Sequence, residues 1–385
     1  MNNKTFATLF FLIGSIAAAV QSRHRHGTCQ QFDLPITASA ENSIFNLTHI
    51  EDNITARSWA IEEDTWSTPK GAERITKNFT ISGTYNIHVQ LCQPYSNDNT
   101  DVIQIATHGG HYDSRYWDAE LEPEEHSWVE ASLRAGYPIL TYDRLGAGQS
   151  DHPNAYKVVQ AGLELEILRQ LTVMLRNGTL QSAMGQGSES STRVVHVGHS
   201  FGSFLTSAFI AIYPELSDAA IITGYVATEY LARVGYSPWA VQYAPTGEPP
   251  FDRGPGYVLC QKAGIQNIFF GGDPHTAFTK ELLDYGDAIK QPVPVGELAS
   301  GYKLAGLPGL NYTGPLHFML PEFDFFVCAG DCKGVANTTT LQQSYPKASA
   351  IEFDIQPNTG HALPLHNNAT AGFEVSFNFL KRNGF

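Results

Sequence analysis

The chain has 385 residues, of which 42% are hydrophobic and 16% charged, so it can bury a large core in one big domain or in a domain with an insertion. Its formal net charge of -14 at pH 7 would repel phosphate backbones and anionic membranes. Nucleic acid is therefore excluded as an expected partner.

The N-terminus has the pattern of a secretory signal peptide. Lys4 precedes an apolar run over residues 6–13, and small residues follow at 17–19. The alternative is a membrane anchor, but the apolar run is too short to cross a bilayer. We expect residues 1–19 to be removed, the protein to be secreted and extracellular, and no stable membrane anchor to remain.

Asn-x-Ser/Thr triplets become meaningful in a chain that enters the secretory pathway, because glycans are added there. One triplet is a weak signal, but several behind a signal peptide predict a eukaryotic glycoprotein in which most of them are occupied. The candidate asparagines are Asn46, Asn53, Asn78, Asn177, Asn311, Asn337 and Asn368.

Five cysteines lie in the sequence, and an oxidising compartment favours disulfides over metal binding. Cys328 and Cys332 are close enough to close a loop, while Cys29 and Cys92 flank two strands that we expect to pair antiparallel. This hypothesis leaves Cys260 as the free thiol. Sequence alone does not determine the connectivity, so other pairings stay open.

Residues 29–91 are strand-like, with apolar and polar residues alternating, and predict an antiparallel opening sheet. After a polar turn at 96–100, short apolar runs alternate with helical patterns, which is typical of a parallel sheet covered by helices. Helical spacing before Gly178 and the apolar segment 201–213 predict two of these helices. The predicted buried strands are 102–106, 138–142, 193–197, 219–223, 316–320 and 350–355.

The stretch between the predicted strands at 219–223 and 316–320 is too long for one crossover helix. We interpret residues 227–312 as an inserted cap over the strand ends, where open α/β sheets place their sites. The α/β core then comprises residues 20–226 and 313–385. Aromatic residues of the insertion either line a pocket or form the cap's own core: Tyr236, Trp239, Tyr243, Phe251, Tyr257, Phe269 and Phe270.

The pentapeptide Gly198-His199-Ser200-Phe201-Gly202 fits the G-x-S-x-G nucleophile elbow, a strained turn that lifts a serine between a strand and a helix. The motif alone is weak, but here it stands at the junction of a predicted strand and a predicted helix. Flanking glycines avoid the clashes that side chains would cause in such a turn. Ser200 is therefore the candidate nucleophile.

A serine hydroxyl becomes nucleophilic when a base accepts its proton, and an acid must hold that base. His361 lies in the loop after the last predicted strand, from which its imidazole can fold back over the serine. The other histidines have weaker claims: His24 and His26 fall in an expected mobile tail, His199 lies within the elbow, and His366 lies just beyond the candidate.

The acid is expected directly after the strand at 316–320, where Asp324 lies. Glu322 and Asp331 are nearby alternatives. Asp354 belongs to a strand and would point away from the loops.

Backbone N–H groups can stabilise a developing oxyanion without reorganisation. Phe201 supplies one at its helix start, and the turn T-H-G-G at 107–110 makes Gly110 the candidate for the second. The alternative is a turn that only changes the chain direction. A rival hypothesis makes His108 and His111 metal ligands, but no carboxylate or cysteine accompanies them at a convincing spacing. We therefore expect no metal and no cofactor.

Besides the elbow and the His-Gly-Gly turn, the segment 143–153, D-R-L-G-A-G-Q-S-D-H-P, resembles the D-R-x-G-x-G-x-S loop of the α/β-hydrolase superfamily. From about Phe79 onward the chain is similar to that superfamily, and more closely to its secreted fungal members, which are related in layout to capped esterases and epoxide hydrolases. The resemblance implies a mostly parallel central sheet with antiparallel N-terminal strands and an inserted cap. It also implies that Asp143 and Arg144 belong to the scaffold.

Two positions depart from this family. Epoxide hydrolases and haloalkane dehalogenases of this layout carry an aspartate nucleophile where this chain has Ser200, which favours acyl chemistry. The family usually has glycine three residues before the acid, whereas this chain has Pro321, which restricts the turn before Asp324.

The resulting hypothesis is hydrolysis of a carboxylic ester of a small or medium apolar molecule through an acyl-enzyme, with Ser200, His361 and Asp324 as the triad. Lactonase, amidase, peptidase, acyltransferase and cofactor-free peroxidase activities stay open on the same fold. A non-catalytic binding protein is the alternative of another class, although such proteins typically lose a triad residue. The sequence leaves the oligomeric state undetermined.

Overall fold

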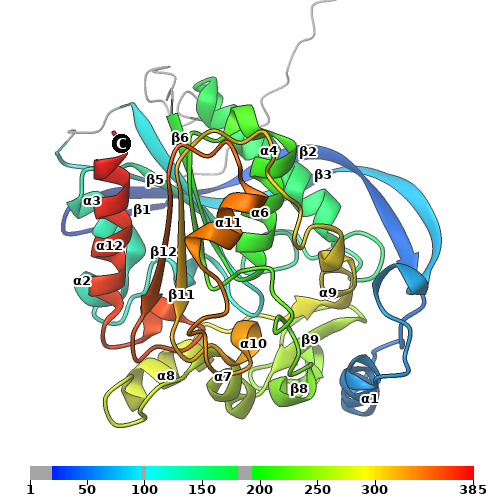
Figure 1. Ribbon diagram of the computed structural model, residues 1–385. Helices are drawn as coiled ribbons and strands as arrows, with labels where there is room; N and C mark the ends of the chain where they lie inside the picture. Colours follow the sequence, from blue (N-terminus) through cyan, green and yellow to red (C-terminus); the bar gives the residue numbers. More distant parts are fainter. Residues whose placement is uncertain (1–19, 97–100, 181–192) are drawn as a thin grey trace, which may run out of the picture.

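The computed structural model describes residues 20–96, 101–180 and 193–385, so the predicted signal peptide at 1–19 lies outside the described residues. Its centre is a nine-stranded sheet with helices on both faces (Figure 1). In the order in which they lie side by side, the strands are β1 (Val20–Arg23), β2 (Gly27–Phe45), β3 (Ile75–Pro94), β5 (Ile139–Tyr142), β4 (Val102–Thr107), β6 (Arg193–His199), β7 (Ala219–Thr223), β11 (Leu316–Pro321) and β12 (Ile351–Gln356).

The N-terminal strands form the predicted antiparallel sheet. β2 and β3 pair along almost their whole length, from Gly27 opposite Pro94 to Phe45 opposite Ile75. Between these two strands, however, the prediction of strand-like structure is wrong, because α1 (Asn53–Asp64) is a helix. It begins at a capping box in which the Asp52 carboxylate accepts a hydrogen bond of 2.7 Å from the Thr55 amide.

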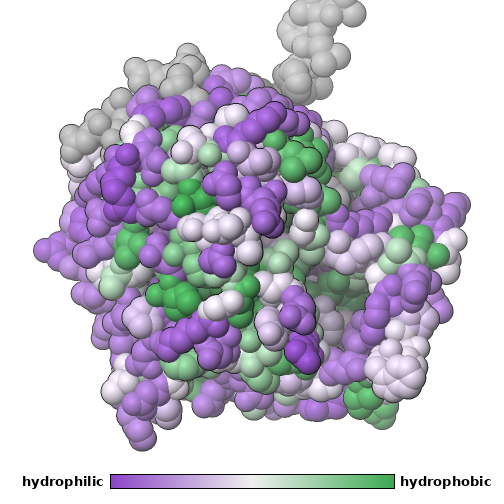
Figure 2. Space-filling view, viewed as in Figure 1, coloured by the Kyte–Doolittle hydropathy of each residue, from purple (hydrophilic) through white to green (hydrophobic). Residues whose placement is uncertain are grey.

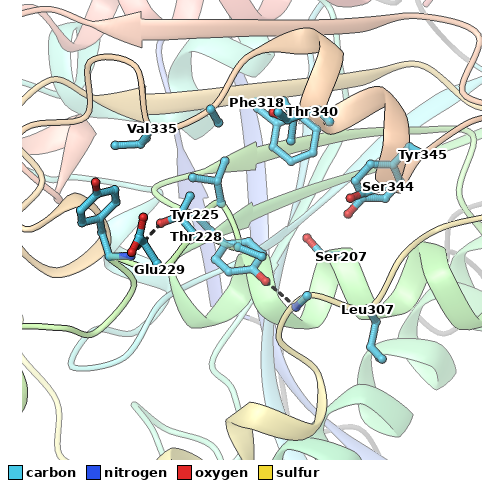
Figure 3. A pocket seen from close by; sticks show the side chains of 16 residues that line it. Ser207, Tyr225, Thr228, Glu229, Leu307, Phe318, Val335, Thr340, Ser344 and Tyr345 are labelled. Atoms are coloured by element: carbon cyan, nitrogen blue, oxygen red, sulfur yellow. Dashed lines mark hydrogen bonds between the residues drawn. The ribbon is translucent and has the colours of Figure 1, made fainter.

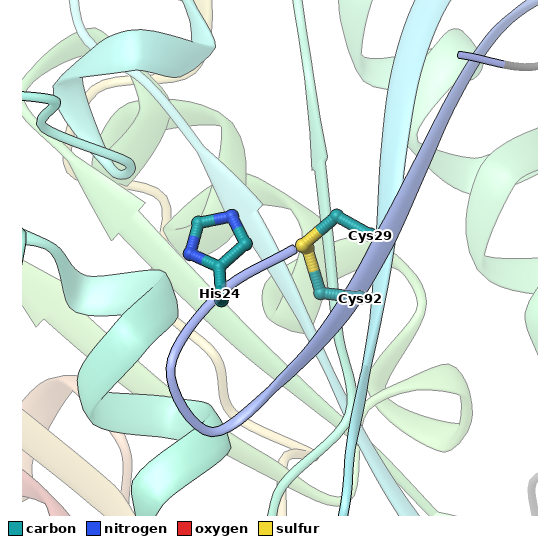
Figure 4. Close-up of side chains that lie close together, drawn as sticks. All are labelled: His24, Cys29 and Cys92. Atoms are coloured by element: carbon teal, nitrogen blue, oxygen red, sulfur yellow. A yellow bond between two sulfur atoms is a disulfide. The ribbon is translucent and has the colours of Figure 1, made fainter. Parts of the chain in front are cut away.

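The disulfides follow the predicted pairing. The bonded pairs are Cys29–Cys92, directly opposite each other on β2 and β3, and Cys328–Cys332, while Cys260 is a buried free thiol. Figure 4 shows the ring of His24 beside the first pair. Because these two sulfurs are bonded to each other, they offer no thiolates with which His24 could hold a metal.

The six predicted core strands are all present, each within two residues of its predicted bounds. Strands β5, β4, β6, β7, β11 and β12 run parallel to one another. Every residue of β4 and β7 is buried, as expected for strands with both faces covered. The carboxyl ends of these strands therefore meet at one edge of the sheet, where the loops with functional candidates begin.

Helices cover the two faces of the sheet and enclose two hydrophobic cores (Figure 1). α4 (Ala161–Arg176) and α6 (Phe201–Ile212) match the two predicted helices and share a core with α11 (Thr338–Ser344). α3 (Trp128–Arg134) and α12 (Ala369–Arg382) contribute to the other core. The short helices α2 (Pro123–His126) and α10 (Phe325–Cys328) lie in connecting loops.

The surface is mixed in character. Figure 2 shows hydrophilic residues over most of the face in view, with the hydrophobic ones in small separate groups. Within the described ranges, no helix has the length and apolar character needed to cross a bilayer.

The predicted insertion at 227–312 has elements of its own: an antiparallel sheet of β10 (Val293–Pro294), β9 (Tyr257–Cys260) and β8 (Val241–Tyr243), with helices α7 (Lys262–Phe269), α8 (Lys280–Ala288) and α9 (Val295–Ser300). Figure 1 shows this group at the end of the sheet where β11 leads into α10. Helix α1 joins the group, because the Asn53 side-chain oxygen accepts a 2.8 Å hydrogen bond from the Tyr243 amide. The division into segments 20–226, 227–312 and 313–385 stays a prediction.

Candidate active site

The candidate nucleophile lies on a sharp turn between β6 and α6. Ser200 has φ 53° and ψ -117°, a strained conformation for a residue with a side chain. The turn packs so tightly that a Cβ added at Gly198 would lie 2.6 Å from the Thr206 hydroxyl oxygen, and one at Gly202 would lie 2.1 Å from the Thr107 carbonyl oxygen. Both glycines of the elbow are therefore required by space, as the motif predicts.

The candidate base approaches the serine from the loop after β12. The Nε2 atom of His361 lies 2.8 Å from the Ser200 Oγ. A second histidine supports this loop: the Gly360 amide donates a 2.9 Å hydrogen bond to His366 Nε2, and His366 Nδ1 donates to the Ala362 carbonyl at 2.9 Å. Burial lowers the pKa of His366 to about 4, so its ring is neutral and its Nε2 can accept a hydrogen bond from the backbone.

The candidate acid holds the other side of the imidazole. One carboxylate oxygen of Asp324 lies 2.5 Å from His361 Nδ1, and the other accepts a 2.8 Å hydrogen bond from the Val327 amide at the start of α10. Asp324 and His361 are fully buried, and Ser200 is only 9% exposed. The three side chains thus form one continuous hydrogen-bonded chain that is shielded from bulk water.

The rival acids point elsewhere. Glu322 accepts a 2.8 Å hydrogen bond from the Asn358 amide and forms an ion pair with Lys333. Asp331 is exposed, and Asp354 lies 3.1 Å from His317. Among the carboxylates that we considered, the structure brings only Asp324 to the base.

The glycine turn after β4 lies directly against the serine. A Cβ added at Gly109 would be 2.8 Å from the Cβ of Ser200, so the turn leaves room only for a residue without a side chain. In the described parts of the chain, the amides of Gly110 and Phe201 have no hydrogen-bond acceptor. These two amides are therefore free to bind an oxyanion beside Ser200.

The histidines of the rival metal hypothesis are engaged with the backbone instead. His108 Nδ1 lies 2.8 Å from the Gly109 carbonyl, and its Nε2 accepts a 2.9 Å hydrogen bond from the Arg144 amide. His111 Nδ1 lies 3.2 Å from the Gln291 carbonyl. Burial lowers the pKa of both rings, that of His111 to about 3. Both ring nitrogens of His108 thus form hydrogen bonds with the backbone, and these bonds hold the glycine turn in place.

The elbow histidine is also structural. His199 stacks on Tyr116 with ring centroids 4.4 Å apart, and its Nδ1 lies 3.2 Å from the Thr223 hydroxyl. Burial lowers its pKa well below the usual range. His199 therefore supports the elbow without contacting the serine oxygen through a hydrogen bond.

The aromatic residues of the insertion divide between the two predicted roles. Phe269 lies beside the base, with its ring centroid 5.6 Å from that of His361, and Trp239 packs edge-on against Phe269 at 5.6 Å. By contrast, Tyr257 is fully buried in a small separate cluster and donates a 2.7 Å hydrogen bond to the Pro153 carbonyl. Thus some of these rings surround the site and others form the insertion's own core.

A cavity of about 330 Å³ lies between α6 and α11, and its lining includes none of Ser200, His361 and Asp324 (Figure 3). Its wall includes Tyr225, which follows Gly224, and a Cβ added at Gly224 would lie 3.3 Å from His361 Cε1. The Tyr225 hydroxyl accepts a 2.9 Å hydrogen bond from the Gly306 amide, which joins the loop after β7 to the last part of the insertion. The remaining wall combines apolar side chains such as Phe318 with hydroxyl groups such as Ser207.

Sequence reasoning missed the acidic residues that surround Arg144. Glu164 on α4 and Glu297 on α9 both contact its guanidinium in the interior. A signal was present for the first, because Glu164 shares a helix face with Leu168 and Leu171, and this face is otherwise apolar. No comparable pattern marks Glu297, because its contact with Arg144 depends on how the insertion packs against the core.

Comparisons with known proteins agree with this architecture. The structure is similar to a carboxylesterase of Nitrososphaera gargenis (13% identity, TM-score 0.52, 77% of this chain and 95% of that one). It is also similar to an α/β-hydrolase-fold protein from Chitinophaga pinensis (13%, 0.50, 77% and 94%) and to MGS-M2, an α/β-hydrolase enzyme from a Medee basin deep-sea metagenome library (17%, 0.50, 77% and 94%). At these identities the likeness shows the fold alone.

The sequence comparisons address the family directly. No curated protein matches the chain. Residues 105–373, however, match the Alpha/beta hydrolase family, and this range contains the elbow, the glycine turn and all three residues of the hydrogen-bonded chain. The protein therefore belongs to the α/β-hydrolase family.

Proposed function

We propose that the protein is a secreted serine hydrolase that cleaves a carboxylic ester of a small or medium apolar substrate through an acyl-enzyme. The observation that carries this proposal is the unbroken chain from Ser200 Oγ to His361 Nε2 at 2.8 Å and from His361 Nδ1 to Asp324 at 2.5 Å. This is the geometry in which a histidine can accept the serine proton while a carboxylate holds the ring. Secretion rests on the predicted signal peptide.

The reaction follows from this geometry. Ser200 Oγ attacks the ester carbonyl carbon as His361 Nε2 takes its proton, and the carbonyl oxygen becomes an oxyanion near the amides of Gly110 and Phe201. His361 then gives the proton to the departing alkoxide, which leaves the acyl group on the serine. Water, activated by the same histidine, releases the acid and restores the hydroxyl.

The surroundings of the triad support an apolar substrate of limited size. Aromatic rings such as Phe269 lie against His361, and the buried triad, with Ser200 only 9% exposed, favours a small or medium apolar group. The carboxylesterase of Nitrososphaera gargenis shares the fold, and its activity is consistent with acyl chemistry on this scaffold.

Labelling with a fluorophosphonate probe tests the proposal. We expect the wild-type protein to be labelled at Ser200 and to hydrolyse a nitrophenyl ester, while Ser200→Ala loses labelling and on the order of a thousandfold or more of the rate. The variant should stay folded by circular dichroism, because the hydroxyl is small. Near wild-type turnover in folded Ser200→Ala would overturn the mechanism, and an unlabelled folded wild type would indicate a binding protein.

A substrate panel then separates the alternatives within acyl chemistry. Short and long nitrophenyl esters, lactones and aminoacyl amides should be compared with the same preparation. We expect the highest kcat/KM for short or medium esters. A clear preference for an amide or a lactone would keep the triad but replace the proposed substrate class.

A further inference from the structure

Arg144 carries a positive charge into the interior between carboxylates from two distant segments. Its Nη1 atom lies 2.5 Å from Glu164 on α4 and 2.8 Å from Glu297 on α9, and its Nη2 lies 3.1 Å from the second oxygen of Glu297. The side chains of all three residues are at most 3% exposed. Moving these charged groups out of water has a high desolvation cost, so the cluster is weak evidence for a contribution to stability alone.

The same guanidinium reaches the turn beside the nucleophile. Arg144 Nε donates a 3.0 Å hydrogen bond to the His108 carbonyl, and Nη2 donates a 3.3 Å bond to the Gly109 carbonyl. Its central carbon lies 4.8 Å from the centre of the Phe201 ring. Arg144 therefore contacts Gly109, which precedes the free amide of Gly110, and the side chain of Phe201, which carries the other free amide.

These contacts bear on the direction of an N–H group. The Gly109 carbonyl and the Gly110 amide belong to one planar peptide unit, in which the C=O and N–H bonds point in opposite directions. The Gly109 oxygen accepts hydrogen bonds from His108 Nδ1 at 2.8 Å and from Arg144 Nη2 at 3.3 Å, and together these fix the direction of the Gly110 N–H. Arg144 in turn is held by both carboxylate oxygens of Glu297, a fork that restricts the guanidinium more than a single contact does.

Glu297 belongs to the insertion and is itself anchored. On α9, the Gly296 amide donates a 2.9 Å hydrogen bond to the Ala155 carbonyl, and the Ser300 hydroxyl accepts a 2.8 Å bond from the Ala161 amide at the start of α4. A Cβ added at Gly110 would lie 3.9 Å from a Glu297 oxygen. The carboxylate is thus close to the free amide without touching the serine.

We infer that Glu297 is a positioning residue for the oxyanion hole: acting through Arg144, it sets the Gly110 amide, so that the hole is complete only when α9 of the insertion is seated on the core. This inference rests on the proposed serine hydrolase function. It gives the insertion a part in transition-state stabilisation besides covering the site.

The test compares two substitutions, each of which replaces an acidic side chain that contacts the same guanidinium with an uncharged amide. Because oxyanion contacts strengthen in the transition state, Glu297→Gln should lower kcat by about tenfold to a hundredfold and change KM by no more than about twofold. Glu164→Gln, the matched control on the core helix, removes a single contact and should lower kcat by less than about threefold. Second-order labelling by the fluorophosphonate should slow in parallel with kcat.

Several outcomes would overturn the inference. These are equal losses of kcat in the two variants, or a loss in Glu297→Gln that lies in KM alone. If Glu297→Gln does not fold, Glu297→Asp keeps the charge but shortens the side chain. It should lose kcat to an intermediate degree, and a wild-type rate would contradict the positioning role. Failure of the proposed function is distinct, because the wild-type protein itself would then not be labelled at Ser200.

Discussion

The carboxylate of Asp324 has two simultaneous tasks. It orients His361 through Nδ1, and it caps α10 through the Val327 amide. Asp324→Asn should lower kcat by about four orders of magnitude, because the amide can stabilise the wrong histidine tautomer and cannot support the imidazolium. Turnover of an activated ester at neutral pH measures this loss.

The neighbouring acidic residues provide the controls for this prediction. Glu322→Gln and Asp331→Asn remove a negative charge from the same loop, but neither carboxylate reaches His361. Both variants should keep most of the wild-type rate. Circular dichroism should accompany the assay, so that damage to the loop is not mistaken for lost chemistry. A large loss of rate in Asp331→Asn together with a normal rate in Asp324→Asn would assign the acid role to Asp331.

For single residues, local sequence motifs predicted the candidate site better than they predicted contacts between distant residues. The elbow and the order of the strands led to Ser200, Asp324 and His361, which lie at or just after the ends of β6, β11 and β12. Pro321 does not displace the acid, because the next amides still bond to β12 and the base loop: Glu322 donates to the Gln356 carbonyl and Phe323 to the Thr359 carbonyl, both at 2.9 Å. The contact between Arg144 and Glu297 was not predictable, since no local pattern connects residues so far apart.

Among the elements, the N-terminal strand differs most from its prediction. His24 and His26 were expected in a mobile tail, but His24 lies between two carboxylates, 3.3 Å from Asp118 and 3.3 Å from Glu130. His26 also contacts Glu130, and the Gln90 amide donates to Asp118. This segment directly follows β1, so these contacts attach the edge of the sheet to α3 and to the loop before it.

The charge of His24 makes this attachment depend on pH. Burial opposes the charged ring, but the hydrogen bond and charge of Asp118, together with Glu130, outweigh burial and raise the pKa above its usual value of 6.5. A raised pKa adds stability that is fully present below pH 6.5 and is lost as the pH rises through the folded-state pKa. His24→Gln should therefore lower the free energy of unfolding by about 1 kcal/mol at pH 5.5 and by less at pH 9.

Urea denaturation at the two pH values measures this difference. The matched control is His49→Gln, since His49 is largely exposed beside Glu51 and its replacement should change the midpoint little. A destabilisation by His24→Gln that is equal at both pH values would show that the ring acts by packing alone.

The longer elements explain where sequence patterns succeed. Buried parallel strands such as β7 are continuous apolar runs, which are easily recognised. Helix α1 was missed because its buried side is narrow, with only Ala56, Trp59 and Ala60 buried, so it has no strong helical period. Its real signal was the capping residue Asp52 followed by Thr55, and the contacts of α1 with β8 come from tertiary packing.

For the whole molecule, four of the five cysteines form disulfides, and the oxidising compartment itself stays a prediction. The exposure of the candidate asparagines refines the glycosylation prediction. Six of the candidate asparagines are exposed: Asn46, Asn53, Asn78, Asn177, Asn311 and Asn337. The seventh is half-buried and differs from them in its contacts.

Both polar atoms of the Asn368 side chain already form hydrogen bonds. Its oxygen accepts hydrogen bonds of 2.8 Å from the Thr359 hydroxyl and 3.0 Å from Gln356, and its nitrogen donates to the Pro357 carbonyl. These partners belong to β12 and the loop that carries His361, so a glycan on this nitrogen would disturb the base. We therefore predict that the secreted protein carries several glycans but none at Asn368.

Mass measurement before and after endoglycosidase treatment, on protein secreted from a eukaryotic host, tests this prediction. Treatment should lower the mass by several glycans, and an unchanged mass would remove the glycoprotein hypothesis. Asn311→Gln should lower the untreated mass by one glycan, because Asn311 is exposed and contacts only the flexible end of Lys347 at 2.8 Å. Asn368→Gln should leave the glycan mass unchanged, since a half-buried amide whose nitrogen already donates a hydrogen bond is a poor acceptor. Loss of one glycan in Asn368→Gln would mean that this asparagine is modified before the base loop folds against it.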